Sequence, residues 1–512
     1  MRPPVGAWLC SLLTSAWLSA TAAGDAPDPV STLTPSSLPR IGSVDVRFQS
    51  YNIEMVEVTG GWFWKPYRSE PGTAYARPPG SLNDSKQDTR LFQYRPPIDL
   101  GNSRLRKLAA ALAPAYLRVS GTWANSTYFA TSDDAPSAPP MGFGGILTHQ
   151  QWRDVVDFSH AVDASIITSF AISAGVRDAA GVWTSDQARR LLDFTTAVGG
   201  HIAAAEFMNE PDLPAIGGAP TRYSAAQYAR DLQIFLAFIK QADPGLQILG
   251  PGTIGADAIP VELLASAGSA LAAVSFHSYG GLSKRCQGGV TPEAALSEEW
   301  LSRSQRALDY YVRLRDRFAP GKPIWLTETA QAACGGDAWA ASFLDTFRYL
   351  DQLGRMAKSG VQIVIHNTLA ASDYGLLDEI TLLPRPNYWG ALLWRQLMGT
   401  TVLDAGLPKR SGLHVYAHCL RGTSGGVALL VINTDRDAPH ALRLPSASLR
   451  YRLDADRLTD QQVRLNGTAL ALDAGDELPP ITGLPTAADE LTFQPASITF
   501  LAIAAAGNES CR

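Results

Sequence analysis

Short apolar runs alternate with longer amphipathic segments along most of this 512-residue chain. The short runs are rich in β-branched and aromatic residues and are apolar almost throughout, as expected of parallel strands that are covered on both faces. We predict eight such strands, at residues 44–52, 115–120, 165–172, 203–208, 246–250, 272–276, 324–327 and 362–367.

The segments between these runs have the apolar periodicity of surface helices, and several begin with a capping residue such as Thr148, Ser185 or Ser224. They cover residues 103–112, 148–162, 185–198, 224–242, 259–271, 297–318, 338–359 and 388–398. Eight strand and helix pairs are typical of an α/β fold, the (β/α)8 TIM barrel, which we place at residues 42–400. A doubly wound sheet is the alternative, but it normally has a glycine-rich phosphate loop after its first strand, and this sequence has none there.

Both ends of the chain depart from this pattern. Residues 1–23 combine Arg2, an apolar run and a final stretch of small residues, which is the layout of a cleavable secretory signal peptide. The leader or linker that follows, residues 24–41, is rich in Pro, Ser and Thr and is a candidate extra strand of the C-terminal β-domain. Short strands with turn residues between them predict a C-terminal β-sandwich over residues 401–512, with strands at 414–419, 426–432, 441–444, 463–465 and 498–503.

The charge balance limits the possible partners. The formal net charge is −5 and no strong basic run is present, which argues against a nucleic-acid ligand. The same charge would repel a heavily sulfated polyanion at long range. After the signal, no stretch has the ~20 uninterrupted apolar residues of a membrane span, and nothing indicates an obligate protein partner. We therefore expect a secreted protein, either extracellular or periplasmic.

The cysteines that follow the signal peptide are Cys286, Cys334, Cys419 and Cys511, an even set that suits an oxidising compartment. Two disulfides are one interpretation, and four buried thiols are the other. Cys286 follows the sixth predicted strand and Cys334 the seventh, and loops after neighbouring barrel strands lie side by side, so the geometry predicts a bond between them. No C-x-x-C spacing indicates zinc or redox chemistry, and we expect neither a metal nor an organic cofactor.

Two glutamates stand where a barrel enzyme carries its chemistry, at the carboxyl ends of strands. Glu210 ends the fourth strand in a Phe-Met-Asn-Glu-Pro run, and Glu328 ends the seventh in a Trp-Leu-Thr-Glu-Thr run. Hydrolysis of a glycosidic bond needs one carboxylic acid and one carboxylate on opposite sides of the anomeric carbon, about 5 Å apart in a retaining enzyme. The two strand ends predict this pair, whereas ordinary salt-bridge partners at the barrel rim are the alternative.

Two further residues are candidates for supporting roles. Arg118 ends the second strand and is predicted either to hold Glu328 ionised or to pair with Glu206 inside the barrel. Asn209, directly before Glu210, is predicted to hydrogen-bond a sugar 2-hydroxyl, and stabilisation of the local turn is the alternative.

The order of several motifs resembles the heparanase and bacterial β-glucuronidase family of glycoside hydrolases, family 79. The resemblance extends over nearly the whole mature chain. Its most specific stretches are residues 100–103, 113–118, 207–211, 276–279, 325–329, 335–336, 373–376, 415–419 and 464–467. The resemblance implies double displacement with retention, in which Glu210 is the acid/base and Glu328 the nucleophile.

The resemblance also implies which residues bind the glucuronate. The expected pocket residues are Asn52, Thr122, Asn209, Tyr279, Lys284, Gly335, Gly336, His366 and Tyr374, with Arg118 and His277 as supporting residues. The paired glycines are expected to offer backbone N–H groups to the sugar carboxylate, and Tyr374 its hydroxyl. Mammalian members have arginine where this chain has Lys284 and glutamine where it has His366. Cys419 and Cys511 fall where the family closes its β-domain with a disulfide.

The expected activity is retaining hydrolysis of β-linked glucuronic acid in a carbohydrate substrate. An insertion at residues 60–97 carries Trp62, Trp64, Tyr67 and Tyr94. It would either close the site beyond the terminal sugar, giving exo action, or stack further sugars, and exo action is slightly favoured. The alternatives are an endo-acting, heparanase-like enzyme on heparan sulfate and a non-catalytic carbohydrate-binding protein. Residues 127–144 are too few for the excised linker of mammalian members, so no proteolytic activation is expected.

Overall fold

A closed barrel of eight parallel strands forms the larger part of the protein in this computed structural model, which describes residues 30–67, 90–255, 261–263, 267–407 and 412–512. Around the barrel the strands are β3 (Gln49–Glu54), β6 (Ala115–Ser120), β9 (Ala164–Ser169), β10 (Ile202–Glu206), β11 (Gln247–Thr253), β12 (Ala273–His277), β13 (Ile324–Thr329) and β14 (Ile363–His366). Each of the eight predicted strands overlaps one of these. The predicted (β/α)8 barrel is therefore confirmed.

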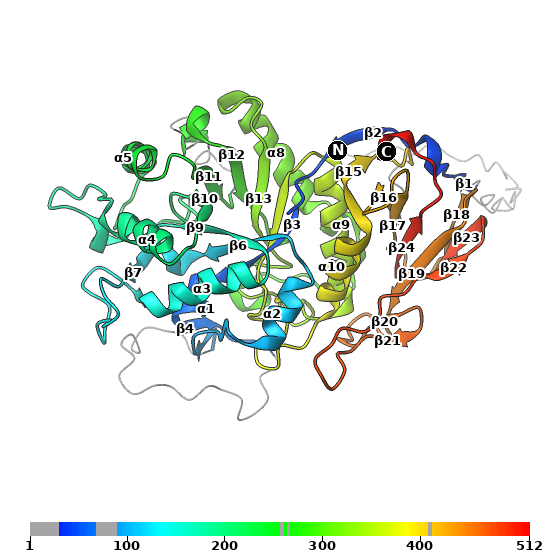
Figure 1. Cartoon of the computed structure of the whole chain (residues 1–512), viewed down its shortest axis with the longest axis horizontal. Helices are drawn as coiled ribbons and strands as arrows, with labels where there is room; N and C mark the ends of the chain where they lie inside the picture. Colours follow the sequence, from blue (N-terminus) through cyan, green and yellow to red (C-terminus); the bar gives the residue numbers. More distant parts are fainter. Residues whose placement is uncertain (1–29, 68–89, 256–260, 264–266, 408–411) are drawn as a thin grey trace, which may run out of the picture.

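Helices cover the outside of the barrel (Figure 1). They include α2 (Ser103–Ala110), α3 (His149–Ala161), α4 (Asp186–Ala197), α5 (Ala225–Ala242), α8 (Arg303–Phe318), α9 (Phe343–Lys358) and α10 (Pro386–Leu397). Thr148 and Ser224 cap α3 and α5 as expected, because each hydroxyl accepts a backbone N–H of the first turn. The predicted helix at 297–318 is divided into α7 (Glu298–Leu301) and α8, and the one at 259–271 lies largely outside the described residues. No described helix has the length and apolar character needed to cross a membrane.

Inside the barrel, an apolar layer lies below a polar one. The apolar layer consists of Tyr116, Ile167, Ala204, Leu249, Ala273, Trp325, Ile363 and Ile365. Two residues further along their strands come Arg118, Glu206, Ser275 and Thr327, all buried. Because alternate residues of a strand face the same side, the apolar layer closes the bottom of the space in which these polar side chains meet.

The C-terminal region is a β-sandwich, as predicted. Its larger sheet contains β2 (Arg40–Ser43), β15 (Met398–Leu403), β16 (Leu413–Leu420), β17 (Val427–Asn433), β24 (Ser497–Ile503), β19 (Ser448–Asp454), β20 (Arg464–Leu465) and β21 (Thr468–Ala469), with β22 (Leu484–Thr486) beside β19. The smaller sheet contains β1 (Ser31–Thr32), β18 (His440–Leu444) and β23 (Asp489–Phe493). Side chains of both sheets, including Leu429 and Leu442, form one apolar core. The strands β15, β19, β21, β22 and β23 were not predicted.

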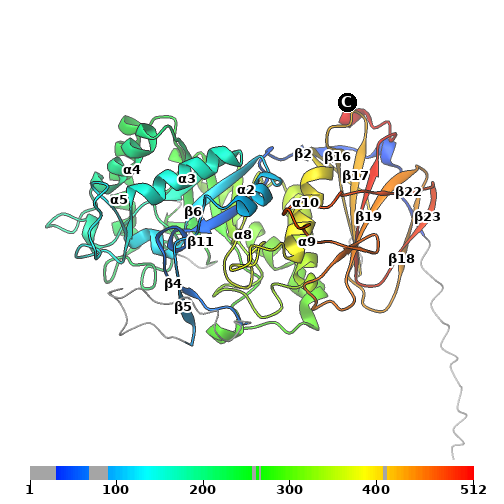
Figure 2. The ribbon, with the colours of Figure 1, turned by 60° about the horizontal axis from the view of Figure 1, so that its bottom comes forward.

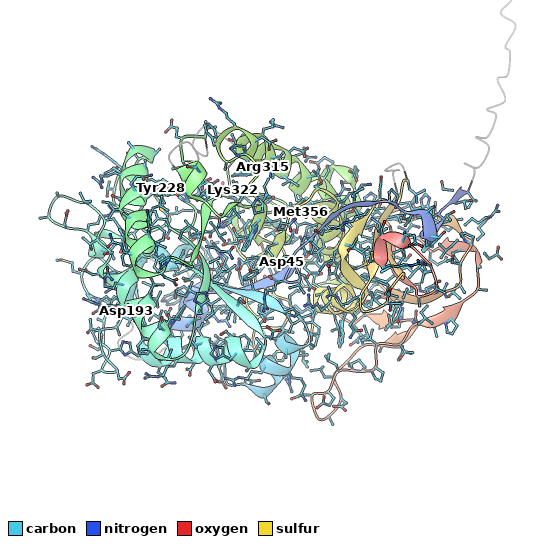
Figure 3. All side chains as sticks on the ribbon, turned by 45° about the horizontal axis from the view of Figure 1, so that its top comes forward. Asp45, Asp193, Tyr228, Arg315, Lys322 and Met356 are labelled. Atoms are coloured by element: carbon cyan, nitrogen blue, oxygen red, sulfur yellow. A yellow bond between two sulfur atoms is a disulfide. The ribbon has the colours of Figure 1, made fainter. Side chains whose placement is uncertain are left out.

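The other face of the larger sheet packs against α9 and α10, which lie between the barrel and the sandwich (Figure 1). Met356 of α9, labelled in Figure 3, is fully buried and shares a core cluster with Leu430 of β17 and Phe500 of β24. The two regions are therefore joined by a continuous apolar interface.

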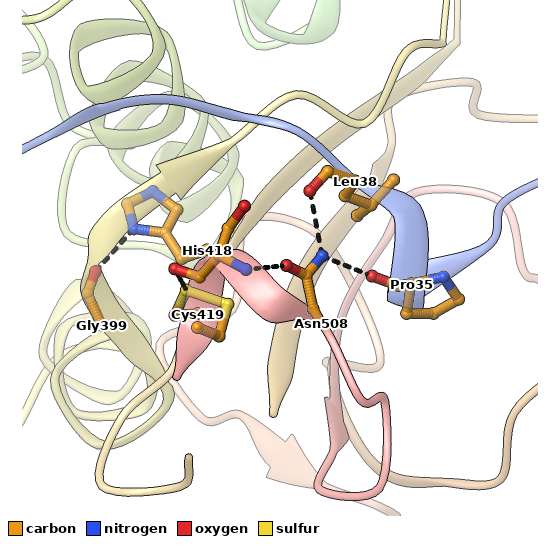
Figure 4. Close-up of a disulfide and its surroundings, with 8 residues drawn as sticks. Pro35, Leu38, Gly399, His418, Cys419 and Asn508 are labelled. Carbon is orange, nitrogen blue, oxygen red and sulfur yellow. Dashed lines mark hydrogen bonds between the residues drawn. A yellow bond between two sulfur atoms is a disulfide. The ribbon is translucent and has the colours of Figure 1, made fainter. Parts of the chain in front are cut away.

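Both ends of the described chain join the sandwich. Strand β1 pairs with β18 and β2 pairs with β15, so the predicted boundaries near residues 41 and 400 fall inside strands. The Asn508 amide donates to the carbonyl oxygens of Pro35 and Leu38, and the Cys419–Cys511 disulfide links β16 to the last turn (Figure 4). The predicted signal peptide, residues 1–23, lies outside the described residues.

Candidate active site

Glu210 and Glu328 come together at the carboxyl end of the barrel. Glu328 belongs to β13, and Glu210 follows β10 in a left-handed conformation with φ of 46°. A non-glycine residue in this region costs about 1–3 kcal/mol, which surrounding contacts must offset. Together with His277 the two carboxyl groups have ligand-type atoms within 4.8 Å of one another. Their side chains are 10% and 7% exposed, so both are nearly buried yet reachable from solvent.

Arg118 makes both of the contacts that the sequence left as alternatives. Its Nη1 lies 2.8 Å from Glu328 Oε2, and its Nη2 lies 2.8 Å from Glu206 Oε2. Nη2 also donates to Asn209 Oδ1 at 2.8 Å. The guanidinium is fully buried, and removing one partner of such a pair usually costs about 3–5 kcal/mol. Arg118 therefore fixes the nucleophile candidate and the residue before the acid candidate at once.

His277 connects the two carboxyl groups. Its Nδ1 lies 3.0 Å from Glu210 Oε1, and its Nε2 lies 3.2 Å from Arg118 Nη2. Burial disfavours a charged ring, but the charge of Glu328 and the hydrogen bonds to Glu206 and Glu210 outweigh it and raise the pKa of His277 to about 10. The ring is therefore protonated, and its Nδ1–H donates to Glu210. A metal ion bound by Glu210, His277 and Glu328 would have to break these contacts.

The environments of the two carboxyl groups push their pKa values apart. Burial raises the pKa of Glu210, and the charge of nearby Glu328 raises it further, although the hydrogen bond from His277 opposes both. Burial also disfavours ionisation of Glu328, but His277, Arg118 and the Tyr279 hydroxyl, which donates at 2.6 Å, outweigh it and lower the pKa of Glu328. One group is thus kept as an acid and the other as a carboxylate, the division of labour that glycoside hydrolysis requires.

This division predicts a bell-shaped pH profile of kcat/KM on substrates with poor leaving groups. Ionised Glu328 is needed, so activity is lost as the pH falls through its lowered pKa, below the ordinary value of 4.5. Protonated Glu210 is needed, so activity is lost as the pH rises through its raised pKa, above 4.5. Rate measurements from about pH 3 to 8, which cover both sides of the ordinary carboxyl pKa, test this. A basic limb below pH 4.5 would contradict the assignment of Glu210 as the acid.

The structure brings two of the residues implied by the resemblance, Tyr279 and Tyr374, to a shared partner, Asn367. The Asn367 amide nitrogen lies 3.0 Å from the Tyr279 hydroxyl and 3.3 Å from the Tyr374 hydroxyl. Asn52 of β3 faces the barrel interior, and neither its amide nitrogen nor its amide oxygen has a partner among the described residues. Such buried polar atoms normally have a partner, and a substrate hydroxyl would supply one. Thr122 is half-buried at the start of the turn after β6.

His366 and Lys284 are placed differently from the expectation. Ile363 and Ile365 face the barrel interior, so His366 points outward, with its ring 5.2 Å from that of Tyr349 and its Nε2 2.8 Å from the Tyr374 carbonyl oxygen. Burial lowers the pKa of His366 to about 3, so it is neutral. The next residue, Asn367, contacts the Tyr279 and Tyr374 hydroxyls instead. Lys284 is exposed, and the neighbouring Arg285 faces the site loops.

The glycine pair forms a tight turn after β13. Both residues have φ of 80°, which side chains rarely adopt. The Gly336 N–H donates to the Ala332 carbonyl oxygen at 3.1 Å, and the Gly335 carbonyl oxygen accepts from the Ser372 hydroxyl at 3.0 Å. Gly336 is therefore already paired within the turn, in contrast to the expected donation of both N–H groups to a ligand.

Glu54, at the end of β3, is a site residue that the sequence reasoning missed. Its Oε1 accepts from the Asn367 amide at 3.0 Å, and a side chain on Gly121 would place its Cβ 1.5 Å from Oε2. Burial, and then the charge of Glu328, raise the pKa of Glu54 well above the usual range. The sequence does contain one indication of this role. Glu54 lies two residues after Asn52, and this spacing puts both side chains on the same face of the strand.

The insertion after β3 forms a hairpin of β4 (Gly61–Trp64) and β5 (Phe92–Arg95), which projects beyond the barrel strands (Figure 2). Its aromatic rings pair with each other: Trp64 stacks on Phe92 with centroids 4.4 Å apart, and Trp62 meets Tyr94 edge-on at 6.5 Å. The Ser372 hydroxyl donates to the Trp64 carbonyl oxygen at 3.4 Å. The hairpin is thus attached to the loop that carries Tyr374.

A disulfide joins Cys286 to Cys334, the pair that the barrel geometry predicted. It links the loop after β12 to the loop that carries Gly335. Replacing both cysteines with serine is expected to raise KM for a glucuronide more than it lowers the melting temperature, because the Gly335 turn, to which the resemblance assigns the sugar carboxylate, would lose its covalent link to the loop after β12.

The matched control is the Cys419→Ser/Cys511→Ser variant, whose disulfide lies in the sandwich. This variant is expected to lower the melting temperature, since disulfide loss typically costs about 2–5 kcal/mol, and to leave KM nearly unchanged. Steady-state kinetics and thermal unfolding of both variants provide the comparison. Equal KM values for the two variants would contradict the prediction.

A (β/α)8 barrel with two nearly buried carboxyl groups at the ends of its fourth and seventh strands has the architecture of a glycoside hydrolase. A model described as "Glycosyl hydrolase family 79, N-terminal domain" matches residues 97–354, and the chain belongs to this family. The resemblance seen in the sequence is thereby confirmed, and the protein is a glycosidase whose substrate is a carbohydrate.

Curated relatives match most of the chain. Heparanase from Mus musculus is 27% identical over 460 residues, covering 78% of this chain and 84% of the relative. Hyaluronoglucuronidase from Hirudo nipponia is 26% identical over 467 residues, covering 81% and 92%. Among solved structures, a 4-O-α-L-rhamnosyl-β-D-glucuronidase from Fusarium oxysporum 12S superposes with a TM-score of 0.64 at 16% identity, covering 93% of this chain and all of that one, which supports the same fold.

Proposed function

We propose that this protein is a secreted, exo-acting β-glucuronidase that works with retention of configuration. The observation that carries the proposal is the pair of Glu210 and Glu328, whose carboxyl groups belong to one cluster spanning 4.8 Å and whose pKa values are shifted in opposite directions. A separation of about 5 Å suits a covalent glycosyl-enzyme, because it leaves no room for a water molecule between the carboxylate and the sugar.

In the first step the Glu328 carboxylate attacks the anomeric carbon while Glu210 transfers its proton to the glycosidic oxygen, and the aglycone leaves as an alcohol. In the second step Glu210 takes a proton from a water molecule, which attacks the anomeric carbon and releases Glu328. Arg118 keeps Glu328 ionised in the free enzyme, and Asn209, held by Arg118, is placed to bond the 2-hydroxyl.

A uronic acid is favoured as the terminal sugar. The resemblance assigns the sugar carboxylate to the Tyr374 hydroxyl and the Gly335 turn, and the names of relatives such as hyaluronoglucuronidase point to the same sugar. The net charge of −5 favours a neutral or lightly charged glycan over heparan sulfate. Two disulfides support export of the enzyme.

Exo action is supported by the hairpin of β4 and β5. Its aromatic rings pack against each other. Its backbone accepts a hydrogen bond from the Ser372 hydroxyl, and the backbone N–H of Tyr67, just after β4, donates to Asp373, the residue before Tyr374. A hairpin held there would close the site beyond the terminal sugar, as exo action requires.

Product analysis tests the proposal. The enzyme is incubated with 4-nitrophenyl β-glucuronide and, separately, with heparan sulfate, and the first product is examined by NMR before mutarotation. Release of the β-anomer of glucuronic acid from the aryl glycoside is expected. Release of the α-anomer would exclude retention, shortened heparan sulfate chains would indicate endo action, and binding without any hydrolysis would identify a carbohydrate-binding protein.

A further inference from the structure

Arg285, in the loop after β12, connects three separate loops at one edge of the proposed pocket. Its Nη1 donates to the Cys334 carbonyl oxygen at 2.8 Å, and its Nη2 lies 2.8 Å from Asp373 Oδ2. Its guanidinium carbon lies 4.1 Å from the centroid of the Tyr67 ring, and its backbone N–H donates to the Tyr67 hydroxyl at 3.1 Å. Only 7% of the side chain is exposed. Arg285 therefore joins the β13 loop, the β14 loop and the segment after β4.

The guanidinium lies directly over the Gly335 turn. A Cβ on Gly335 would stand 2.2 Å from Arg285 Nη1 and 2.5 Å from the Ser372 hydroxyl oxygen, so only glycine fits beneath the guanidinium. Arg285 is also close enough to Tyr374 to lower the pKa of its hydroxyl, against the larger effect of burial. The two groups expected to hold a sugar carboxylate thus share one cationic neighbour. The adjacent Lys284 is exposed.

We propose that Arg285 is the positioning residue that gives this site its preference for a uronic acid over the corresponding neutral sugar. This inference rests on the proposed β-glucuronidase function. Arg285 acts in two ways: it holds the Cys334 carbonyl oxygen, which fixes the direction of the Gly335 backbone, and it provides positive charge where the C6 carboxylate is expected. The ion pair with Asp373 holds the guanidinium in one orientation, so its charge has a fixed position in the site.

The proposal predicts a selective effect that a purely structural role would not produce. A neutral sugar has a hydroxymethyl group in place of the carboxylate, so it gains little from the charge or from the fixed turn. Loss of Arg285 should therefore weaken binding of a uronic acid while leaving binding of the neutral sugar nearly unchanged. Hydrogen bonds to charged groups contribute about 1.5–3 kcal/mol, which corresponds to a change in Kd of about tenfold to hundredfold.

The experiment compares two iminosugars that differ only at C6, one glucuronic-acid-configured and one glucose-configured, by isothermal titration calorimetry on the full chain. For Arg285→Gln, we expect the Kd of the uronic compound to rise at least about tenfold and that of the neutral compound to change less than about twofold. Arg285→Lys, which retains the charge, should restore part of the difference. On 4-nitrophenyl β-glucuronide, KM should rise more than kcat falls, because the reacting carboxyl groups are unchanged.

Arg177 provides a matched control on the opposite side of the barrel, after β9. It is 6% exposed, its Nη1 lies 2.7 Å from Asp231 Oδ2, its Nη2 donates to the Ile172 carbonyl oxygen at 2.9 Å, and it stacks 5.0 Å from the Tyr223 ring centroid. Arg177→Gln should lower the melting temperature without changing the ratio of the two Kd values. This variant shows what the loss of a buried guanidinium does by itself, so that any further effect of Arg285→Gln can be assigned to uronate recognition.

Two outcomes would overturn the inference, and they are distinguishable. If the wild-type protein prefers the uronic compound and Arg285→Gln retains that preference, Arg285 is only a structural residue and the proposed function stands. If the wild-type protein shows no preference for the uronic compound, the role of Arg285 and the proposed glucuronidase function both fail. Only folded protein binds either compound, and both Kd values come from the same sample. Partial unfolding of a variant therefore leaves the ratio of the two Kd values unchanged.

Discussion

Replacing Glu328 with glutamine is expected to abolish turnover while leaving substrate binding largely intact. The amide has nearly the shape of the carboxylate but cannot form the glycosyl-enzyme, so kcat should fall by at least about 10⁴-fold, as when a nucleophile is removed from other covalent enzymes. KM or Kd should change little, because several other groups of the site are also expected to contact the sugar. Single-turnover kinetics and calorimetry with an intact glucuronide measure the two effects separately.

Glu206→Gln is the matched control for this experiment. Glu206 is also a buried glutamate bonded to Arg118, but it lies one layer deeper and also accepts from Ser275 and Thr327. Its replacement should reduce stability and retain measurable turnover. A β-glucuronide-configured epoxide or aziridine should label Glu328 in the wild-type protein. Mass spectrometry that located the label on another residue would overturn the assignment.

Glu210→Ala is expected to affect substrates according to their leaving groups. An activated phenol departs without a proton, whereas an alcohol needs one, so kcat/KM should fall by about 10²–10⁴-fold for poor leaving groups and much less for activated ones. The second step also loses its base, and azide, which needs no deprotonation, should restore the rate and give a glycosyl azide. A series of aryl glucuronides with graded phenol pKa values measures the dependence.

Asp212→Asn is a useful control beside Glu210. This carboxyl group lies in the same loop and accepts backbone N–H groups from Ile254 and Gly255 at 3.1 and 2.7 Å. The Asp212→Asn substitution should not make kcat/KM depend more steeply on the leaving group, and azide should not restore any lost activity. Equal losses on all substrates for Glu210→Ala would exclude Glu210 as the acid.

Local patterns in the sequence were sufficient to locate the strands and the two glutamates. A strand buried on both faces has a continuous apolar run whatever its neighbours are, and the carboxyl end of such a run is the active face of a barrel. Glu210 and Glu328 therefore followed from position alone. The pairing of Cys286 with Cys334 followed equally from the order of neighbouring loops, whereas β19 and β23 of the sandwich, which mix polar and apolar residues, did not.

The direction of side chains at the strand ends was decided only by the tertiary structure. Strict alternation is interrupted where the register shifts between β12 and β13 and between β13 and β14, so Thr327 and Glu328 both face the interior. At the end of β14, alternation turns His366 outward, and Asn367 contacts two tyrosine hydroxyls of the site instead. A one-residue difference of this kind is invisible in a sequence pattern, because it depends on how neighbouring strands are aligned.

Contacts between loops that are far apart in the chain could not be predicted from the sequence either. Arg118 bonds both Glu206 and Glu328 because their two strands turn a carboxylate toward the same guanidinium inside the barrel, and no spacing along the chain encodes this meeting. Arg285, rather than Lys284, faces the Gly335 turn because the disulfide and the Tyr67 ring fix the direction of a short turn. Sequence thus determined which residues reach the carboxyl end of the barrel, whereas register and loop packing decided which of them face one another.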